Sequence, residues 1–118
     1  MSPLNTTIFE LILEGKIPSK KVWENEFVYA FEDIHPLANI HILFIHKKKT
    51  KDLQQMASEA SDQLVQIFSA IADYAKSVGL DQSGYRIVSN IGAQAGQSVF
   101  YTHIHVLAGE LLGPFGRP

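Results

Sequence analysis

The chain has 118 residues, of which 46% are hydrophobic and 19% charged, and its formal net charge is −2. A chain of this length buries roughly two thirds of the surface it exposes when unfolded, enough for one hydrophobic core. The chain has no cysteine, which rules out thiolate zinc sites, disulfide frameworks and cysteine nucleophiles. Its nearly balanced charge argues against nucleic-acid binding driven by overall charge. It also shows no membrane-span or signal-peptide pattern, so we expect a cytoplasmic protein of one domain, residues 1–118.

The N-terminal part of the chain predicts one short helix and two strands. Thr7 and Glu10 form a capping-box pattern, which starts a helix that Gly15 ends. The aromatic and β-branched run from Phe27 to Phe31 predicts an interior strand, and His41 to His46 predicts the next one.

The rest of the chain predicts a long helix and two further strands. Apolar residues recur every three or four positions between Leu53 and Val78, the pattern of an amphipathic helix. Tyr85 to Ser89 and Ser98 to Leu107 predict strands on either side of a glycine-bearing loop, and the tail from Gly109 to Pro118 is expected to be irregular. The predicted fold is α+β, a mostly antiparallel sheet of about five strands with one long and one short helix.

The predicted strand 98–107 carries the clearest functional signal. Side chains alternate along a strand, so Tyr101, His103 and His105 share one face. The opposite, mainly apolar face consists of Phe100, Thr102, Ile104 and Val106.

Two chemistries fit this histidine pair. A His-x-His strand can supply two metal ligands, with further ligands from His41, His35 or Asp33. A neutral imidazole can also act as a nucleophile near neutral pH, with a second imidazole steadying the developing charge.

The surrounding sequence favours phosphate chemistry. Loop 90–98 combines glycines, which allow close backbone approach, with the neutral donors Gln97 and Ser98, and so suits a phosphate. Asp33 follows an apolar strand, where its carboxylate could accept hydrogen bonds from a ribose or cap the turn. The basic cluster of Lys47, Lys48, Lys49 and Lys51 predicts a solvated surface, because no aromatic residues are interleaved with the lysines.

The stretch from Gly96 to Leu107 resembles the signature of the histidine triad (HIT) nucleotide-binding proteins, His-φ-His-φ-His-φ-φ, where φ is hydrophobic. Similarity to the Hint-type branch of that family extends through Thr7–Phe9, Gly15–Pro18, Ala30–Ile34, Gly84–Arg86 and Asn90. The resemblance implies a HIT-like fold, a homodimer, and hydrolysis of purine nucleoside phosphoramidates without a metal or other cofactor. The near-neutral charge and the absence of a membrane-span pattern lead us to expect no nucleic-acid or membrane partner.

The resemblance also implies a role for each matching residue. His103 would attack the α-phosphorus of a nucleotide to give a nucleotidyl-histidine that water hydrolyses. His105 would contact phosphate or leaving-group oxygens, His41 would complete the imidazole cluster, and Asp33 would bind the ribose. The remaining nucleotide-binding positions are Ile8, Phe9, Phe31 and Ile34 around the base, and Asn90, Gly96, Gln97, Ser98 and Val99 at the phosphate.

The chain departs from the signature at its first triad position, which is Tyr101. If that position orients His103 through its backbone, activity survives, whereas a tyrosine cannot replace an imidazole that tunes the pKa of His103. Thr102 is a milder, polar departure at a usually hydrophobic site. We expect an active enzyme with altered rate or leaving-group preference.

The alternatives are a catalytically weakened nucleotide-binding regulatory protein, a dinucleoside polyphosphate hydrolase and a histidine-based metal-binding module. His35 and His46 are expected to have no part in the site.

Overall fold

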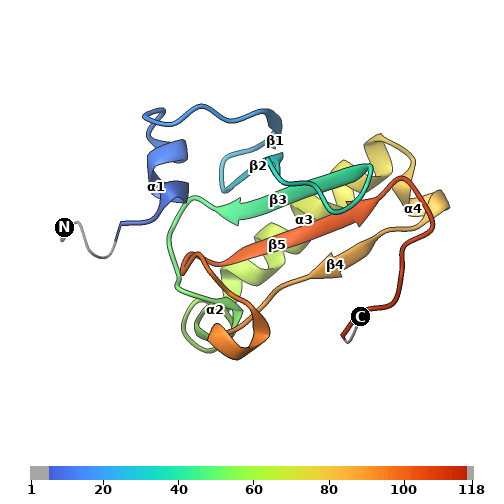
Figure 1. Cartoon of the computed structure of the whole chain (residues 1–118). Helices are drawn as coiled ribbons and strands as arrows, with labels where there is room; N and C mark the ends of the chain where they lie inside the picture. The colour runs from blue at the N-terminus through green and yellow to red at the C-terminus, as the bar shows by residue number, and fades with distance from the viewer. Residues whose placement is uncertain (1–5, 117–118) are drawn as a thin grey trace.

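The structure, a computed structural model, describes residues 6–116 and has an α+β architecture. Five strands form one antiparallel sheet in the order β1-β2-β3-β5-β4 (Figure 1). The strands are β1 (Lys21–Glu24), β2 (Val28–Glu32), β3 (Ile40–His46), β4 (Arg86–Val88) and β5 (His103–Ala108). The predicted fold class, a mostly antiparallel sheet of about five strands with few helices, is confirmed.

Within residues 6–116, four helices and one 3-10 turn complete the fold. They are α1 (Ile8–Leu13), α2 (Leu53–Glu59), α3 (Ser61–Ser77), α4 (Leu80–Ser83) and η2 (Ala93–Ala95). α1 starts with the expected capping box, in which Thr7 Oγ1 accepts from the Phe9 N–H and Glu10 Oε1 accepts from the Thr7 N–H. In the part of the chain that the structure describes, no helix is long and apolar enough to cross a membrane.

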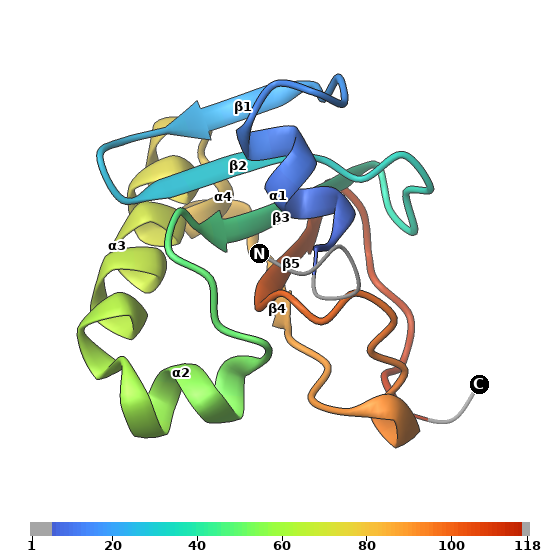
Figure 2. The ribbon, with the colours of Figure 1, turned by 90° about the vertical axis from the view of Figure 1, so that its left-hand side faces the viewer.

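The helix predicted over residues 53–78 is divided in two. Ala60 leaves the helical region with φ −146° and ψ 50°, so α2 ends before it and α3 starts after it. α2 runs across the end of α3 instead of continuing its axis (Figure 2). No glycine or proline marks this position, so the apolar period continues through the break.

The strands differ from the sequence-based expectations in two places. The sequence pattern does not indicate β1, because only Val22 and Trp23 of its four residues are apolar. The strand predicted over 98–107 begins only at His103, since the Thr102 N–H bonds to the Thr50 carbonyl at 2.8 Å instead of joining the ladder. Phe100, expected on the apolar face, is therefore 47% exposed.

The sheet packs on both of its faces, which explains why its central strands are apolar almost throughout. On one face Phe44 and Ile104 pack with α3 in the larger core cluster. On the other, Leu43 and Ile45 pack with Phe9 of α1 in a smaller cluster. Figure 2 shows α3 and α1 on opposite sides of the sheet. Across the β3–β5 ladder these two residues of β3 oppose the histidines of β5, Leu43 facing His105 and Ile45 facing His103. Directly opposed residues share a face, so both histidines lie on the side of α1.

Candidate active site

A cavity of about 510 Å³ opens on the α1 side of the sheet. It brings together segments far apart in the sequence: α1, the end of β2, the start of β3, the loop before β5 and β5 itself. Of the predicted site residues, those that line it are Ile8, Phe9, Phe31, Asp33, Ile34, His41, Asn90, Gly96, Ser98, Val99, His103 and His105. Gln97 and Tyr101 are not part of the lining.

His103 is held in a single tautomer by the backbone. Its Nδ1 lies 2.7 Å from the carbonyl oxygen of Tyr101, and a carbonyl can only accept a hydrogen bond. Nδ1 therefore carries the proton, and Nε2 of the neutral ring keeps its lone pair. The Phe9 ring packs edge to face against the imidazole, with 5.0 Å between ring centroids, and fixes its plane. The ring is thus held in one orientation, with the Nε2 lone pair free.

A chain of hydrogen bonds fixes the tautomers of the other two histidines. The Leu37 N–H donates to His41 Nδ1 at 3.0 Å, so a neutral His41 carries its proton on Nε2. That Nε2 lies 2.8 Å from Nδ1 of His105 and donates to it. The proton of a neutral His105 is consequently on Nε2, the atom left over for a ligand.

Burial keeps this cluster neutral. Burial lowers the pKa of His103, only partly offset by the bond to the Tyr101 carbonyl and the charge of Asp33. Burial also lowers the pKa of His41 against the opposing pull of Asp33. For His105, burial and the two neighbouring imidazoles lower the pKa to about 4. At neutral pH all three rings are uncharged, as a nucleophile and a polarised hydrogen-bond chain require.

Asp33 has two structural roles at the mouth of the cavity. Its Oδ1 accepts from the His35 N–H at 2.8 Å, which is the turn-capping arrangement. Its Oδ2 lies 3.5 Å from Nε2 of His41. Since the side chain is only partly buried and lines the cavity, Oδ2 is also available to hydroxyl groups of a ligand.

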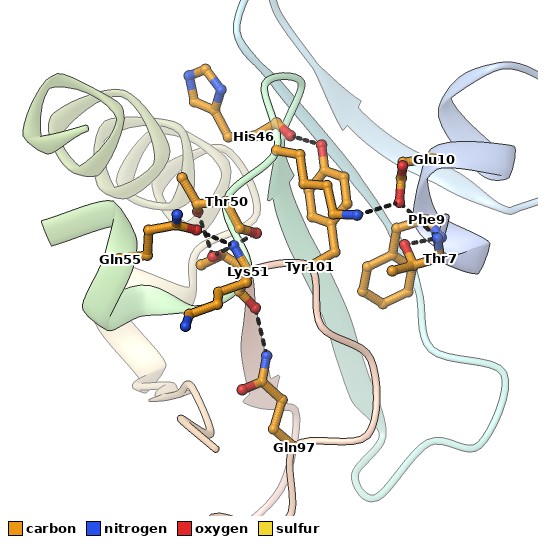
Figure 3. Close-up of polar contacts among 11 residues, drawn as sticks. Thr7, Phe9, Glu10, His46, Thr50, Lys51, Gln55, Gln97 and Tyr101 are labelled. Atoms are coloured by element: carbon orange, nitrogen blue, oxygen red, sulfur yellow. Dashed lines mark hydrogen bonds and ion pairs between the residues drawn. The ribbon is translucent and has the colours of Figure 1, made fainter. Parts of the chain in front are cut away.

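Tyr101 faces the core instead of the cavity. The side chain is 1% exposed, its ring packs against Phe9, and its hydroxyl donates to the carbonyl of His46 (Figure 3). Burial raises the pKa of Tyr101, helped by the charge of Glu10, so the phenol stays neutral. The hydrogen bond from Tyr101 to the histidines of the site comes from its backbone carbonyl.

The side chain of Gln97 braces the loop before β5. Its Nε2 donates to the carbonyl of Lys51 at 2.8 Å (Figure 3). Nε2 also donates to the carbonyl of Val99, and Oε1 accepts from the Gly92 N–H at 2.8 Å. The N–H groups of residues 95–97 bond back to carbonyls of residues 92 and 93. These backbone donors, expected to face a phosphate, instead close the turn, so Gly96 and the Ser98 side chain form the cavity wall.

Sequence reasoning missed several apolar lining residues and one histidine. They are Ile12, Ile17, Pro18, Leu37, Leu43 and His35. The alternation along β3 could have found Leu43, which shares the face of His41. His35, expected to be outside the site, lines the rim, whereas His46 is buried against Gln66 of α3, with 2.6 Å between His46 Nε2 and Oε1.

The cluster also has the donor set of a metal site. Donor atoms of Asp33, His41 and His105 lie within 4.8 Å of one another. However, the two imidazole nitrogens are 2.8 Å apart and share a proton. Two nitrogens on one tetrahedral zinc, each about 2.0–2.1 Å from the ion, lie about 3.3 Å apart. A metal would have to replace this hydrogen bond and separate the rings, so the arrangement fits neutral imidazoles better.

Comparison with known proteins identifies the family. The HIT domain matches residues 14–111, most of the chain. The chain belongs to the HIT domain family. An uncharacterised HIT-like protein of Azospirillum brasilense is 44% identical over 108 residues, which cover 91% of this chain and 88% of the relative. The purine nucleoside phosphoramidase of Escherichia coli K12 is 35% identical over 108 residues, covering 92% of this chain and 91% of that enzyme.

Solved HIT structures share the fold over nearly the whole length. A histidine triad protein from Clostridium difficile is 38% identical with a TM-score of 0.88, covering 98% of this chain and all of that one. A HIT family hydrolase from Clostridium thermocellum is 34% identical with a TM-score of 0.85, covering 92% and 94%. These relatives support a hydrolase-like HIT protein.

Proposed function

We propose that this HIT protein is a purine nucleotide-binding hydrolase that cleaves nucleoside 5′-phosphoramidates at the α-phosphorus. The observation that carries the proposal is the tautomer of His103, whose Nδ1–H bonds to the Tyr101 carbonyl and leaves the Nε2 lone pair free. A nucleophilic imidazole needs this state. The phosphoramidase name of the Escherichia coli relative supports the choice of substrate class.

The cavity suggests how the nucleotide lies. The base would sit among the apolar side chains of α1 and β2, and the ribose hydroxyls would bond to Asp33. The α-phosphate would then reach the wall formed by Asn90, Gly96 and Ser98, beside His103. His105 would donate its Nε2–H to a phosphate oxygen, stabilising the charge that develops there.

The reaction would proceed in two displacements. Nε2 of His103 attacks the α-phosphorus, the P–N bond to the amine breaks, and the amine leaves with the electron pair and takes a proton from solvent. Water then attacks the phosphorus of the nucleotidyl-histidine and gives up a proton to solvent, the P–Nε2 bond breaks, and the electron pair returns to Nε2 of His103. The net reaction adds one water and yields a nucleoside monophosphate and an amine.

Release of AMP from an adenosine phosphoramidate tests the proposal. Wild-type protein should release AMP faster than buffer alone does. An acid-labile nucleotidyl adduct should accumulate during turnover and be detected after rapid quenching. His103→Ala should lose turnover while AMP binding persists. Full turnover in that variant would refute the nucleophile assignment.

The same assay separates the alternatives. Tight AMP binding without release would indicate a nucleotide-binding regulatory protein whose catalysis has weakened at Tyr101. Faster release of AMP from a dinucleoside polyphosphate than from the phosphoramidate would indicate a phosphate leaving group. Activity lost in chelator and restored by zinc would favour the metal-binding alternative built on Asp33, His41 and His105.

We also propose that the chain forms a homodimer. The support is the family resemblance together with apolar side chains that remain exposed near β4 and the C-terminal segment, such as Ile87, Leu111 and Phe115. Sedimentation equilibrium at micromolar concentration should show a dimer, and a monomer alone would refute this proposal.

A further inference from the structure

The loop at the end of β3, defined as residues 46–51 with His46 as the last strand residue, braces the phosphate side of the cavity. Segment 97–102 meets it in three places. The Tyr101 hydroxyl donates to the His46 carbonyl and Gln97 Nε2 donates to the Lys51 carbonyl (Figure 3). The Thr102 N–H donates to the Thr50 carbonyl. The Thr50 and Thr102 hydroxyls add a buried bond of 2.6 Å. This loop therefore fixes the segment whose backbone holds His103.

The same loop reaches the other wall of the cavity through one side chain. Lys49 Nζ lies 3.1 Å from Oε1 of Glu10 in α1, and the two side chains keep only 31% and 11% of their surface exposed. The same oxygen accepts the Thr7 N–H at 2.7 Å. Burial alone would raise the pKa of Glu10, but the bonds from Thr7 and Lys49 lower it, so the carboxylate is charged at neutral pH.

α1 depends on such contacts for its position. It has six residues, and a helix of this length is not stable without tertiary contacts. The apolar contacts of α1 come from Ile12 and Leu13, which pack on the smaller core cluster, and from Phe9. The Phe9 ring lies edge to face with Phe31 at 5.6 Å and with His103 at 5.0 Å. Ile8, Phe9 and Ile12 of this helix line the cavity. Any movement of α1 therefore moves the wall proposed to hold the base and the ring that packs on His103.

We propose that Lys49 and Glu10 are positioning residues whose ion pair holds α1 as the base-side wall of the nucleotide cavity. One member of the basic cluster thus has a role in the site, which it exerts through the position of α1. The inference rests on the proposed nucleotide hydrolysis and adds a determinant of nucleotide affinity. Chain segments 8–13 and 97–103 are then fixed by one loop, each from a different side.

A double-variant cycle tests this pair. Lys49→Met removes the charge at similar length, and Glu10→Gln keeps an oxygen that can still accept the Thr7 N–H. Lys48→Met is the matched control, because Lys48 is the exposed neighbour in the same cluster and carries the same charge. Lys49→Arg restores the cation and should restore the wild-type values.

Each single variant should raise KM for the phosphoramidate, and Kd for AMP, about 3- to 10-fold, the range expected for a partly buried ion pair, with kcat within about twofold. The double variant should be no worse than either single one, and Lys48→Met should match wild type. Unchanged KM, a kcat loss without a KM change, or additive effects in the double variant would overturn the proposal.

Hydrogen exchange separates this proposal from the proposed function. In Lys49→Met the α1 amides should lose protection while those of α3 keep it, whether or not a nucleotide binds. If the wild-type protein neither hydrolyses the phosphoramidate nor binds AMP, the proposed function is refuted. The proposed effect of the ion pair on nucleotide affinity is then refuted as well. Unchanged protection of α1 would refute the ion pair as its anchor.

Discussion

The carbonyl oxygen of Tyr101 accepts the Nδ1–H of His103 at 2.7 Å. Position 101 thus acts on the candidate nucleophile through an atom that every residue carries. Its side chain is committed elsewhere, to the core around Phe9 and to the carbonyl of His46. The side chain of Tyr101 therefore contributes packing and anchoring.

Tyr101→Phe should lower stability more than activity. The His46 carbonyl loses its phenol donor in a buried setting, which costs about 1–2 kcal/mol, while the aromatic packing and the Tyr101 carbonyl remain. Urea unfolding measures the stability, and AMP release should stay within about threefold of wild type. Tyr101→Ala, which also removes the ring, should cost about 3–5 kcal/mol. A loss of kcat above about 100-fold in Tyr101→Phe at unchanged stability would assign chemistry to the phenol.

Acid should destabilise the protein through His105. Its folded pKa of about 4 lies below the ordinary 6.5, so the unfolded chain binds a proton between these values that the folded chain does not. The contribution of His105 to the free energy of unfolding is therefore fully present above pH 6.5 and is lost as the pH falls towards 4. Urea unfolding at pH 7.5 and pH 5 should differ by about 1–2 kcal/mol more in wild type than in His105→Asn. An equal pH dependence in both proteins would show that His105 contributes nothing.

His41→Ala should release the tautomer of His105. Without the donor at 2.8 Å, His105 Nδ1 no longer has to accept, and its Nε2 carries the proton only part of the time. Nitrogen chemical shifts should change from one tautomer to a mixture, and kcat should fall about 10-fold or more, because a fixed donor to the phosphate is lost. A pure Nε2–H tautomer in the variant would refute the hydrogen-bond chain.

Asp33→Asn should weaken nucleotide binding without opening the turn. The amide oxygen can still accept the His35 N–H, whereas the new NH₂ group cannot accept from a ribose hydroxyl. KM for an adenosine phosphoramidate should rise about 10-fold, as expected for hydrogen bonds to a charged group. The matched 2′,3′-dideoxy substrate is the control, and its KM should barely change. The same rise with both substrates would place the effect outside the ribose.

The sequence predicted the face of the histidines better than the extent of their strand. Side chains alternate between the two faces of a strand, and this alternation is enough to place His103 and His105 on the same face. It does not show where pairing starts, because the bond from Thr102 to Thr50 depends on a loop about fifty residues away. The same limit applies to Gln97, whose side chain turns into the loop, and to Lys49, whose partner lies in α1. Residue type indicates a donor or a charge, while long-range contacts decide what it faces.

The hydrogen-bond chain from Leu37 through His41 to His105 ends in a peptide N–H, which does not ionise. No proton can therefore be passed along it to refill His105, and a neutral imidazole that gave up its remaining N–H would become an imidazolate. The two rings can orient a hydrogen bond but cannot supply a proton. In the proposed reaction the departing amine must be protonated by bulk water, so the cavity has to stay hydrated on the leaving-group side while the nucleoside side is enclosed.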